Sequence, residues 1–399
     1  MATSAGVGFS EHRNPAQAGK DAALQALEQA GTAKPDFVFV FATVGYNQQA
    51  LLRAIREVTA GAPLSGCSGE GIITRETVAE TNFGVAVMVI SSAELRFNHA
   101  MVQGIGGGAA QAGERLAGEI RPFLAPDNIA CFLLADGLVF NFDPFLSAFE
   151  TALRQAGQAG PLPLFGGLAA DNWASHKTYQ YHNDEVFSEG LSCVVMSGSG
   201  GIASGVNHGC VPVGGKRIIT RSQGNIIYEI DGIPALDALQ DYLGEDWRTQ
   251  WNKTSLNVCL GFKTPAHLKH GYEEYIIRYM MGKDDEQGGV TIQSEVSEGT
   301  ELWIVRRDKE LITCGMQAIS GQIREQLAGR TPRFVLHFEC VGRGKVVFRE
   351  QEKLELIRGL QQEIGENVPW IGLYTYGEIG PVVSNNCFHN FTSVVTAVY

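Results

Sequence analysis

The chain has 399 residues, of which 44% are hydrophobic and 19% charged, and its formal net charge is −12. The length predicts two or more domains, and the acidic balance argues against a nucleic-acid partner, because phosphate contacts need clustered Lys and Arg. No apolar run approaches the roughly 18 residues of a membrane helix, and no basic start precedes an apolar block, so we expect a cytoplasmic protein without a membrane partner.

The first part of the chain predicts alternating strands and helices. Residues 5–31 predict a short strand and then a helix that begins at Asn14-Pro15 and ends at Gly31. Residues 37–47 predict a strand with a polar turn, followed by a helix that ends at Gly61. Residues 82–90 predict a buried strand, and a glycine-rich start opens a helix over 104–120.

In the middle of the chain the predicted elements change from alternating strands and helices to closely spaced strands. Residues 129–141 predict another buried strand, and Asp143-Pro144 predicts the start of a helix that ends at Gly157. From 178 to 232, closely spaced strands and turn residues predict an antiparallel meander. A helix that begins near Pro234 follows, and we place a boundary there, which predicts domains over residues 1–230 and 231–399. A second strand-rich segment (272–296) precedes the final part of the chain.

Three stretches repeat one plan: an apolar strand, a polar turn, a helix, and then Pro-x-x-Gly before an acidic residue. They cover residues 37–70, 129–172 and 333–378 and end near Glu70, Asp171 and Glu378. In a β-helix-β unit both strands are parallel, so their polar turns lie at strand carboxyl ends, where open α/β sheets bind ligands. The near-continuous apolar strands predict burial on both faces. We therefore expect a mixed α/β fold of parallel β-helix-β units and antiparallel meanders.

Catalytic and metal-binding signatures are absent from the sequence. Phosphate-loop, dinucleotide, zinc-protease and Ser-hydrolase motifs do not occur, so we expect no enzyme, no catalytic residue and no metal. The eight cysteines are scattered singly, which is typical of reduced, buried thiols. Cys67 and Cys340 lie in two of the repeated turns, where a core position and a ligand or redox role both remain open.

Polar residues at the strand ends are the candidate ligand-binding groups. They are Glu70, Asp136, Asn141, Asp171, Asn172, Arg343 and Glu378. Arg343 lies between two glycines, and its guanidinium suits a carboxylate ligand, but it could equally pair with Glu339 or Glu378. Asp171 and Asn172 favour a structural role, since Asx residues commonly cap turns. All of these assignments assume that the strand-end turns converge.

Several segments in the same order along the chain resemble the FIST family, the F-box and intracellular signal transduction proteins. They are FGGLAADN (165–172), GCVPVG (209–214), FECVGRG (338–344), YTYGEIGP (374–381) and FHNFTSVV (388–395). The resemblance implies an N-terminal and a C-terminal FIST domain that together cover nearly the whole chain. Within these segments, Tyr376 and Asn390 join the candidate ligand-binding residues. Phe391 stands where an FHNQT-like form is expected, which puts in doubt any ligand contact just after Asn390.

The resemblance also implies a function. It implies a sensory module that binds a small, amino-acid-like ligand and signals through a separate partner such as a histidine kinase. Some FIST proteins resembling this stand-alone form bind haem and sense nitric oxide, and His208 and His182 are the candidate axial ligands here. We therefore expect a small-ligand sensor. The haem-dependent nitric-oxide sensor is the first alternative, followed by an enzyme using Cys67, Cys340, Glu70 or Glu378, and by a scaffold protein without a small ligand.

Overall fold

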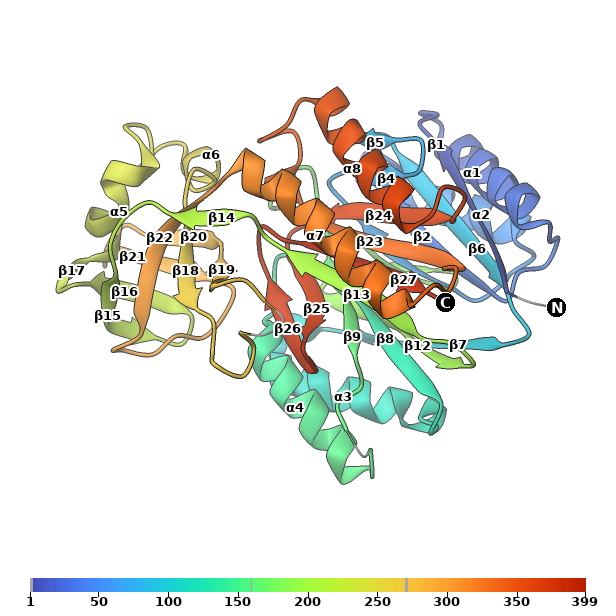
Figure 1. Ribbon diagram of the computed structural model, residues 1–399, viewed down its shortest axis with the longest axis horizontal. Helices are drawn as coiled ribbons and strands as arrows, with labels where there is room; N and C mark the ends of the chain where they lie inside the picture. Colours follow the sequence, from blue (N-terminus) through green and yellow to red (C-terminus); the bar gives the residue numbers. More distant parts are fainter. Residues whose placement is uncertain (1–2, 159, 270–271) are drawn as a thin grey trace.

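The computed structural model describes residues 3–158, 160–269 and 272–399, and it confirms the expected mixed α/β class. Strands of these residues form four sheets, three of six strands and one of nine. The three smaller sheets belong to three units of one plan, and the larger sheet projects from them at one end of the molecule (Figure 1).

The first unit begins at the N-terminus. Its elements are β1 (Ser4–Ser10), α1 (Pro15–Ala30), β2 (Phe37–Ala42), α2 (Gln48–Val58), β3 (Leu64–Ser68), β4 (Ile72–Thr74), β5 (Val78–Ala79) and β6 (Val85–Ser91). The Asn14 side chain caps α1 by accepting from Gln17 N, Pro15 is its first residue, and Gly31 ends it in the left-handed region. The predicted bounds of this helix are therefore confirmed.

The second unit repeats this order. Its elements are β7 (Leu95–Gln103), η1 (Ile105–Gly107), α3 (Ala109–Ile120), η2 (Arg121–Phe123), β8 (Asn128–Ala135), α4 (Phe142–Gln155), β9 (Leu164–Leu168), β10 (Gln180–His182), β11 (Glu185–Phe187) and β12 (Gly190–Gly198). Helix α4 begins at Phe142, two residues before the predicted first residue Pro144, with Asn141 rather than Asp143 at the N-cap.

The third unit is split by an insertion. Its elements are β13 (Ile202–Asn207), α7 (Lys309–Leu327), β23 (Phe334–Cys340), η3 (Val341–Arg343), α8 (Glu350–Ile364), β24 (Trp370–Thr375), β25 (Glu378–Val382), β26 (Asn385–His389) and β27 (Ser393–Val398). In the first two units the opening strand is followed within a few residues by its helix, whereas here residues 208–308 intervene.

Residues 208–308 form the nine-stranded sheet, which we call the inserted sheet. Its elements are β14 (Cys210–Pro212), β15 (Arg217–Gln223), β16 (Ile226–Ile230), β17 (Ile233–Pro234), α5 (Ala235–Leu243), α6 (Trp251–Thr254), β18 (Cys259–Lys263), β19 (Tyr275–Arg278), β20 (Met280–Asp284), β21 (Gly289–Ile292) and β22 (Glu301–Arg307). The predicted boundary at residues 230 and 231 falls between β16 and β17, which pair with each other, and it stays a prediction.

Each six-stranded sheet is completed by a hairpin from another unit. The three strand orders are β1-β6-β2-β3-β10-β11, β7-β12-β8-β9-β25-β26 and β13-β27-β23-β24-β4-β5. The hairpin β10–β11 of the second unit thus extends the first sheet, β25–β26 extends the second, and β4–β5 extends the third. The strands between 178 and 232 pair antiparallel, but they are distributed over all four sheets instead of forming one meander.

The Pro-x-x-Gly motif has the same structural role in all three units. The carbonyls of Pro63, Pro163 and Pro369 each accept the first hydrogen bond from the neighbouring parallel strand. The glycine three residues later then lies against that strand: a Cβ at Gly66 or Gly166 would be 1.9 Å from a backbone carbonyl oxygen, and one at Gly372 would be 2.5 Å away. A side chain cannot fit there, which explains the glycine in each repeat.

The parallel strands are covered on both faces, as their apolar sequences predict. On one face of β2, β8 and β23, the side chains of Phe39, Phe132 and Phe338 pack with their neighbours. Together they form one core that the three sheets share. The rings of Phe39 and Phe132 are 5.9 Å apart, centroid to centroid. The opposite faces pack against the helices α1 and α2, α3 and α4, and α7 and α8 (Figure 1). The shared core fixes the carboxyl ends of strands from different units near one another.

Candidate functional site

A cleft lies where the second unit, the third unit and the inserted sheet meet. It holds about 630 Å³ of atom-free space, part of it open to solvent. Its lining residues are Gly137, Leu138, Trp173, Ser175, Asn252, Leu256, Tyr279, Met281, Gln293, Cys340, Val341, Gly342, Tyr376, Asn390 and Phe391. None of these described lining residues carries a charged side chain.

Aromatic side chains form the walls of the cleft. The rings of Trp173 and Tyr376 lie 6.0 Å apart and those of Tyr279 and Phe391 lie 5.9 Å apart. Trp173 and Phe391 both have positive φ, at 59° and 56°. Such a backbone costs on the order of 1–3 kcal/mol for a bulky residue and persists only where its surroundings impose it. Two strained aromatic residues therefore face one small cleft.

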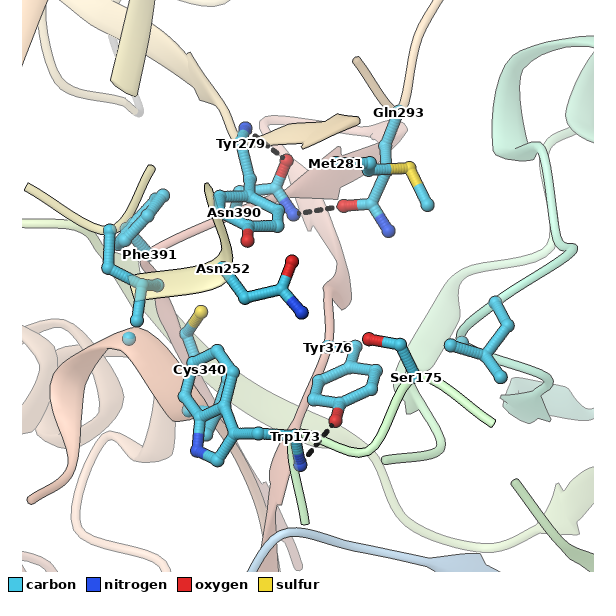
Figure 2. Close-up of a pocket in the computed structure, with 15 residues that line it drawn as sticks. Trp173, Ser175, Asn252, Tyr279, Met281, Gln293, Cys340, Tyr376, Asn390 and Phe391 are labelled. Atoms are coloured by element: carbon cyan, nitrogen blue, oxygen red, sulfur yellow. Dashed lines mark hydrogen bonds between the residues drawn. The ribbon is translucent and has the colours of Figure 1, made fainter. Parts of the chain in front are cut away.

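A chain of amides joins the third unit to the inserted sheet across the cleft. Asn390 Oδ1 accepts from Tyr279 N (3.0 Å), and Asn390 Nδ2 donates to Gln293 Oε1 (2.6 Å). Figure 2 shows these two bonds and the Asn252 side chain reaching into the cleft. Gln293 Nε2 and the Asn252 amide make no hydrogen bond to another described residue. These groups can donate to or accept from a ligand.

A side chain of the first unit helps to fix the position of Trp173, which lines the cleft. Trp173 N lies within hydrogen-bonding distance of both Glu70 Oε2 (3.1 Å) and Tyr376 Oη (2.9 Å), and the Tyr376 hydroxyl donates to Asp171 Oδ1 (2.8 Å). Burial, followed by the charges of Glu70 and Asp171, raises the pKa of Tyr376, so the phenol keeps its proton. All three units thus contribute to the position of Trp173.

Glu70 is a buried carboxyl with an unusual titration. Burial raises its pKa to about 8, although Lys345 Nζ at 3.8 Å opposes the shift. A raised pKa in the folded protein stabilises it at low pH, and this contribution is lost as the pH rises through about 8. Its Oε1 atom has no hydrogen-bond partner among the described residues.

We expect Glu70→Gln to flatten the pH dependence of stability. Between pH 5 and pH 9 the unfolding free energy of the native protein should fall more than that of the variant, by on the order of 3 kcal/mol. Urea unfolding at pH 5, 7 and 9 measures this difference. Glu80, whose pKa burial raises to about 7, remains in both proteins and adds a slope of the same sign to each. Parallel pH profiles would show that Glu70 titrates normally.

The other strand-end carboxylates hold loops. Asp136 accepts from the N–H groups of Leu138 and Val139, and its second oxygen accepts from Thr178 and Glu189. It therefore shapes the turn that presents Gly137 and Leu138 to the cleft.

The carboxylates of Asp171 and Glu378 also accept hydrogen bonds from neighbouring loop residues. Asp171 accepts from the N–H groups of residues 175–177, and Glu378 accepts from the Thr375 hydroxyl and from Thr392 N. Burial raises the pKa of Glu378 well above its usual range. Neither side chain lines the cleft.

The two candidate asparagines near these turns lie outside the cleft as well. Asn172 donates to Asn82 Oδ1 and, like Trp173, has a positive φ. Asn141 is the N-cap of α4, yet its side chain makes no cap hydrogen bond and its buried Oδ1 has no partner among the described residues.

Arg343 is committed to internal contacts. It is fully buried; its Nε donates to Glu339 Oε1 (3.0 Å) and its Nη1 donates to the carbonyls of Asn207 and His208. Lys353 also pairs with Glu339 (2.5 Å). Burial alone would raise the pKa of Glu339, but the two cations hold it well below its usual range. The structure thus brings Arg343 to Glu339, the pairing alternative, and not to the cleft.

The two histidines do not form a haem site among the described residues. His208 is buried, its Nδ1 accepts from Cys210 N, and its Nε2 lies 2.9 Å from the Tyr275 carbonyl. Both ring nitrogens are therefore occupied. His182 stacks on His99 with centroids 4.2 Å apart, and neither lines the cleft. A haem needs an axial nitrogen that faces an apolar pocket. His208 has no free ring nitrogen, and His182, whose buried Nδ1 has no hydrogen-bond partner among the described residues, does not line the cleft, so neither residue fits a haem there.

The cysteines give no support to a nucleophile. Cys67 is fully buried among the phenylalanines of the shared core, and Cys340 lines the cleft. Burial, with a further contribution from Glu378, raises the pKa of Cys340 well above its usual range, so its thiol stays protonated. In the described residues no group of three or more His, Cys, Asp or Glu side chains could hold a metal ion. No described helix is long and apolar enough to cross a membrane.

Sequence reasoning missed the contribution of the inserted sheet. Of the predicted ligand-binding residues, Tyr376 and Asn390 line the cleft, as does Cys340, for which a ligand or redox role was left open. Asn252, Tyr279, Met281 and Gln293 were not predicted. These four lie in a segment without the repeated plan, and only the packing of the sheets brings them to the strand ends. Trp173 follows the predicted pair Asp171 and Asn172 directly, and an aromatic residue beside such a turn was a usable signal.

Curated relatives from two mycobacteria extend along almost the whole chain. An uncharacterised protein of Mycobacterium tuberculosis is 26% identical over 395 residues, which cover 97% of both chains. An uncharacterised protein of Mycobacterium bovis is 24% identical over the same span. One from Methanocaldococcus jannaschii is 23% identical over 232 residues, covering 54% of this chain and 43% of that protein.

Two solved structures share limited likeness. A chorismatase aligns over 100% of this chain and 99% of its own at 10% identity, with a TM-score of 0.36. A cyanuric acid hydrolase covers 50% of this chain and 69% of its own at 13% identity, with a TM-score of 0.28. At these scores neither carries an argument about fold or chemistry.

Two domain families match this chain. Residues 36–233 match the FIST N domain and residues 235–381 match the FIST C domain, which together span most of the chain. FIST domains are regarded as sensors of small ligands in signal transduction. The chain belongs to the FIST family, as its sequence segments indicated.

Proposed function

We propose that the protein is a small-molecule sensor whose ligand binds in the cleft between the units and the inserted sheet. The observation that carries this proposal is the set of strained aromatic walls and unpartnered amides around one cleft without charged lining residues. Backbone strain of this kind concentrates at binding sites, where contacts with the ligand offset part of the strain energy.

The lining defines the ligand chemistry. Trp173, Tyr376 and Phe391 offer faces and edges for a flat or apolar body, and Gln293 and Asn252 offer amide donors and acceptors. A charged ligand would lose its hydration without gaining a counter-charge. We therefore propose a neutral ligand with a flat face and amide-like polar edges, rather than the carboxylate expected from Arg343.

The position of the cleft suggests how binding is transmitted. Asn390 is the hydrogen-bonded link between the third unit and the inserted sheet, and a ligand beside it contacts both. Binding would then restrain the inserted sheet relative to the units, which presents a changed surface to a partner. A separate signalling protein such as a histidine kinase remains the proposed receiver, and co-purification with and without ligand tests it.

We expect Asn252→Ala to weaken ligand binding by about tenfold, the effect of losing one or two hydrogen bonds. Asn252 is exposed and makes no hydrogen bond to another described residue, so stability should not change. A thermal-shift screen of neutral heterocycles and carboxamides supplies the ligand, and calorimetry gives the dissociation constants. Lys253→Ala, the next residue of α6 and outside the lining, is the matched control and should bind normally. Equal affinities in both variants would exclude the cleft.

A further inference from the structure

A second cavity lies on the other side of the contact between β19 and the third unit. It holds about 420 Å³ of atom-free space, part of it open to solvent. Strand β19 ends at Arg278, which lines this cavity, whereas the next residue, Tyr279, lines the cleft. Phe142 and Leu146 of α4, Val382 of β25 and Phe388 of β26 give the second cavity apolar walls.

Arg278 is a buried cation with spare hydrogen-bonding capacity. Only 9% of the residue is exposed, its Nε donates to Ser294 Oγ (2.8 Å), and its Nη1 donates to the carbonyls of Ile277 and Phe388 (both 3.0 Å). All three partners are neutral. In the described part of the chain no acceptor reaches Nη2, and no carboxylate lies within ion-pair distance of the guanidinium.

An unpaired guanidinium is costly to bury. Burial lowers the pKa of Arg278, but a guanidinium remains protonated in proteins. Desolvating such a charge without an anion costs several kcal/mol, and a fork of N–H donors pairs best with a carboxylate. A bound ligand with an anionic group would pair with the guanidinium and offset part of this desolvation free energy.

Arg278 is the only cationic side chain among the described residues that line this cavity. Burial lowers the pKa of His389 to about 3 and raises that of Cys387 to about 11, so both are neutral near pH 7. Burial likewise raises the pKa of Tyr272 well above its usual range. Asp143 is the one carboxylate among the described lining residues; it acts on Arg278 at long range and accepts from Glu295 N (3.3 Å). Glu150 lies outside the lining and accepts from Asn386 Nδ2 (3.1 Å).

Helix α4 adds a second favourable feature. Its first two residues, Phe142 and Asp143, line the cavity, and the side chain of the N-cap residue Asn141 makes no capping hydrogen bond. A helix N-terminus carries partial positive charge from its free N–H groups, which favours an anion. Asp143 provides a fixed charge there and would also attract an ammonium group on the ligand.

We propose that this cavity is a second binding site, for a small molecule with an apolar body and one carboxylate that pairs with Nη2 of Arg278. Apolar α-amino acids and simple aryl or alkyl carboxylates share this chemistry. Asp143 distinguishes them, because it attracts an α-ammonium group and repels a ligand that has only the carboxylate.

Calorimetry with three probes of one shape tests the site: 3-phenylpropionate, L-phenylalanine and 3-phenylpropionamide. At least one of the two carboxylates should bind at least tenfold more tightly than the neutral amide. Arg278→Lys should weaken that binding at least tenfold, because a point charge replaces the fork. Asp143→Asn should tighten 3-phenylpropionate if simple carboxylates are the ligands, and weaken L-phenylalanine if amino acids are.

Three further measurements complete the test. Leu146→Trp fills the cavity from α4 and keeps the Arg278 side chain, so it should abolish binding even if Arg278→Lys fails to fold. The bound probe should slow alkylation of Cys387, which lines this cavity, but not of the exposed Cys314, as mapped by peptide mass spectrometry. Asn252→Ala should leave this binding unchanged, which separates it from the cleft. Equal affinity for the amide and the carboxylates, or binding unaffected by Leu146→Trp, would overturn the proposal.

Discussion

Gly166→Ala should lower the free energy of unfolding by about 3–5 kcal/mol. A Cβ at this position would lie 1.9 Å from the carbonyl oxygen of Leu133, its partner on the parallel strand β8, and φ is +148°. Backbone on the neighbouring strand cannot move as a flexible side chain can, so overpacking and an unfavourable φ add together. Guanidinium-induced unfolding followed by circular dichroism measures the loss.

Gly118→Ala is the matched control. Gly118 lies in α3, is exposed, and a Cβ there would meet no atom within 4 Å. Because alanine is the better helix former, this variant should be more stable than the native protein by about 0.5–1 kcal/mol. If both substitutions had the same effect, the close-approach explanation of the Pro-x-x-Gly motif would be wrong.

Arg343→Met should cost about 3–5 kcal/mol of unfolding free energy, the usual result of removing one partner of a buried ion pair. Glu339 would lose one of its two cations, and the carbonyls of Asn207 and His208 would lose their shared donor. These carbonyls lie where the chain enters the inserted sheet, so its connection should loosen as well. Urea unfolding measures the loss, and Arg306→Ala, at an exposed arginine, should change stability by less than about 0.5 kcal/mol.

The same variant separates a structural role from a ligand role. If Arg343 were a ligand group, its replacement would lower affinity and leave the unfolding free energy nearly unchanged. The structure supports the opposite result. The sequence allowed both outcomes because Arg343 has glycine neighbours and two carboxylates in reach, and only the packing of α8 against β23 places Lys353 and Glu339 beside it.

The units themselves were predictable from local chemistry. Asn14-Pro15 and Gly31 mark the ends of α1, and the apolar strands and Pro-x-x-Gly turns predict the parallel pairs β2–β3, β8–β9 and β23–β24. Each of these signals acts within one unit, so a single sequence contains it.

The assembly of the units was not predictable in this way. The hairpins that complete each sheet come from another unit, and β13 pairs with β27 across nearly two hundred residues of chain. No periodicity in β4 or β10 specifies which sheet edge they join. The cleft depends on this assembly, which is why Tyr376 and Asn390 were found and the residues of the inserted sheet were not.

Hydrogen–deuterium exchange with a ligand from the cleft screen tests the central claim most directly. The proposed sensor should show slower exchange on both sides of the cleft, in residues 173–177 and 340–344 of the units and in residues 279–293 of the inserted sheet. Trp173 N and Tyr279 N are the hydrogen-bonded amides nearest the ligand. Protection confined to one side, or to residues away from the cleft, would contradict a ligand that joins the inserted sheet to the units.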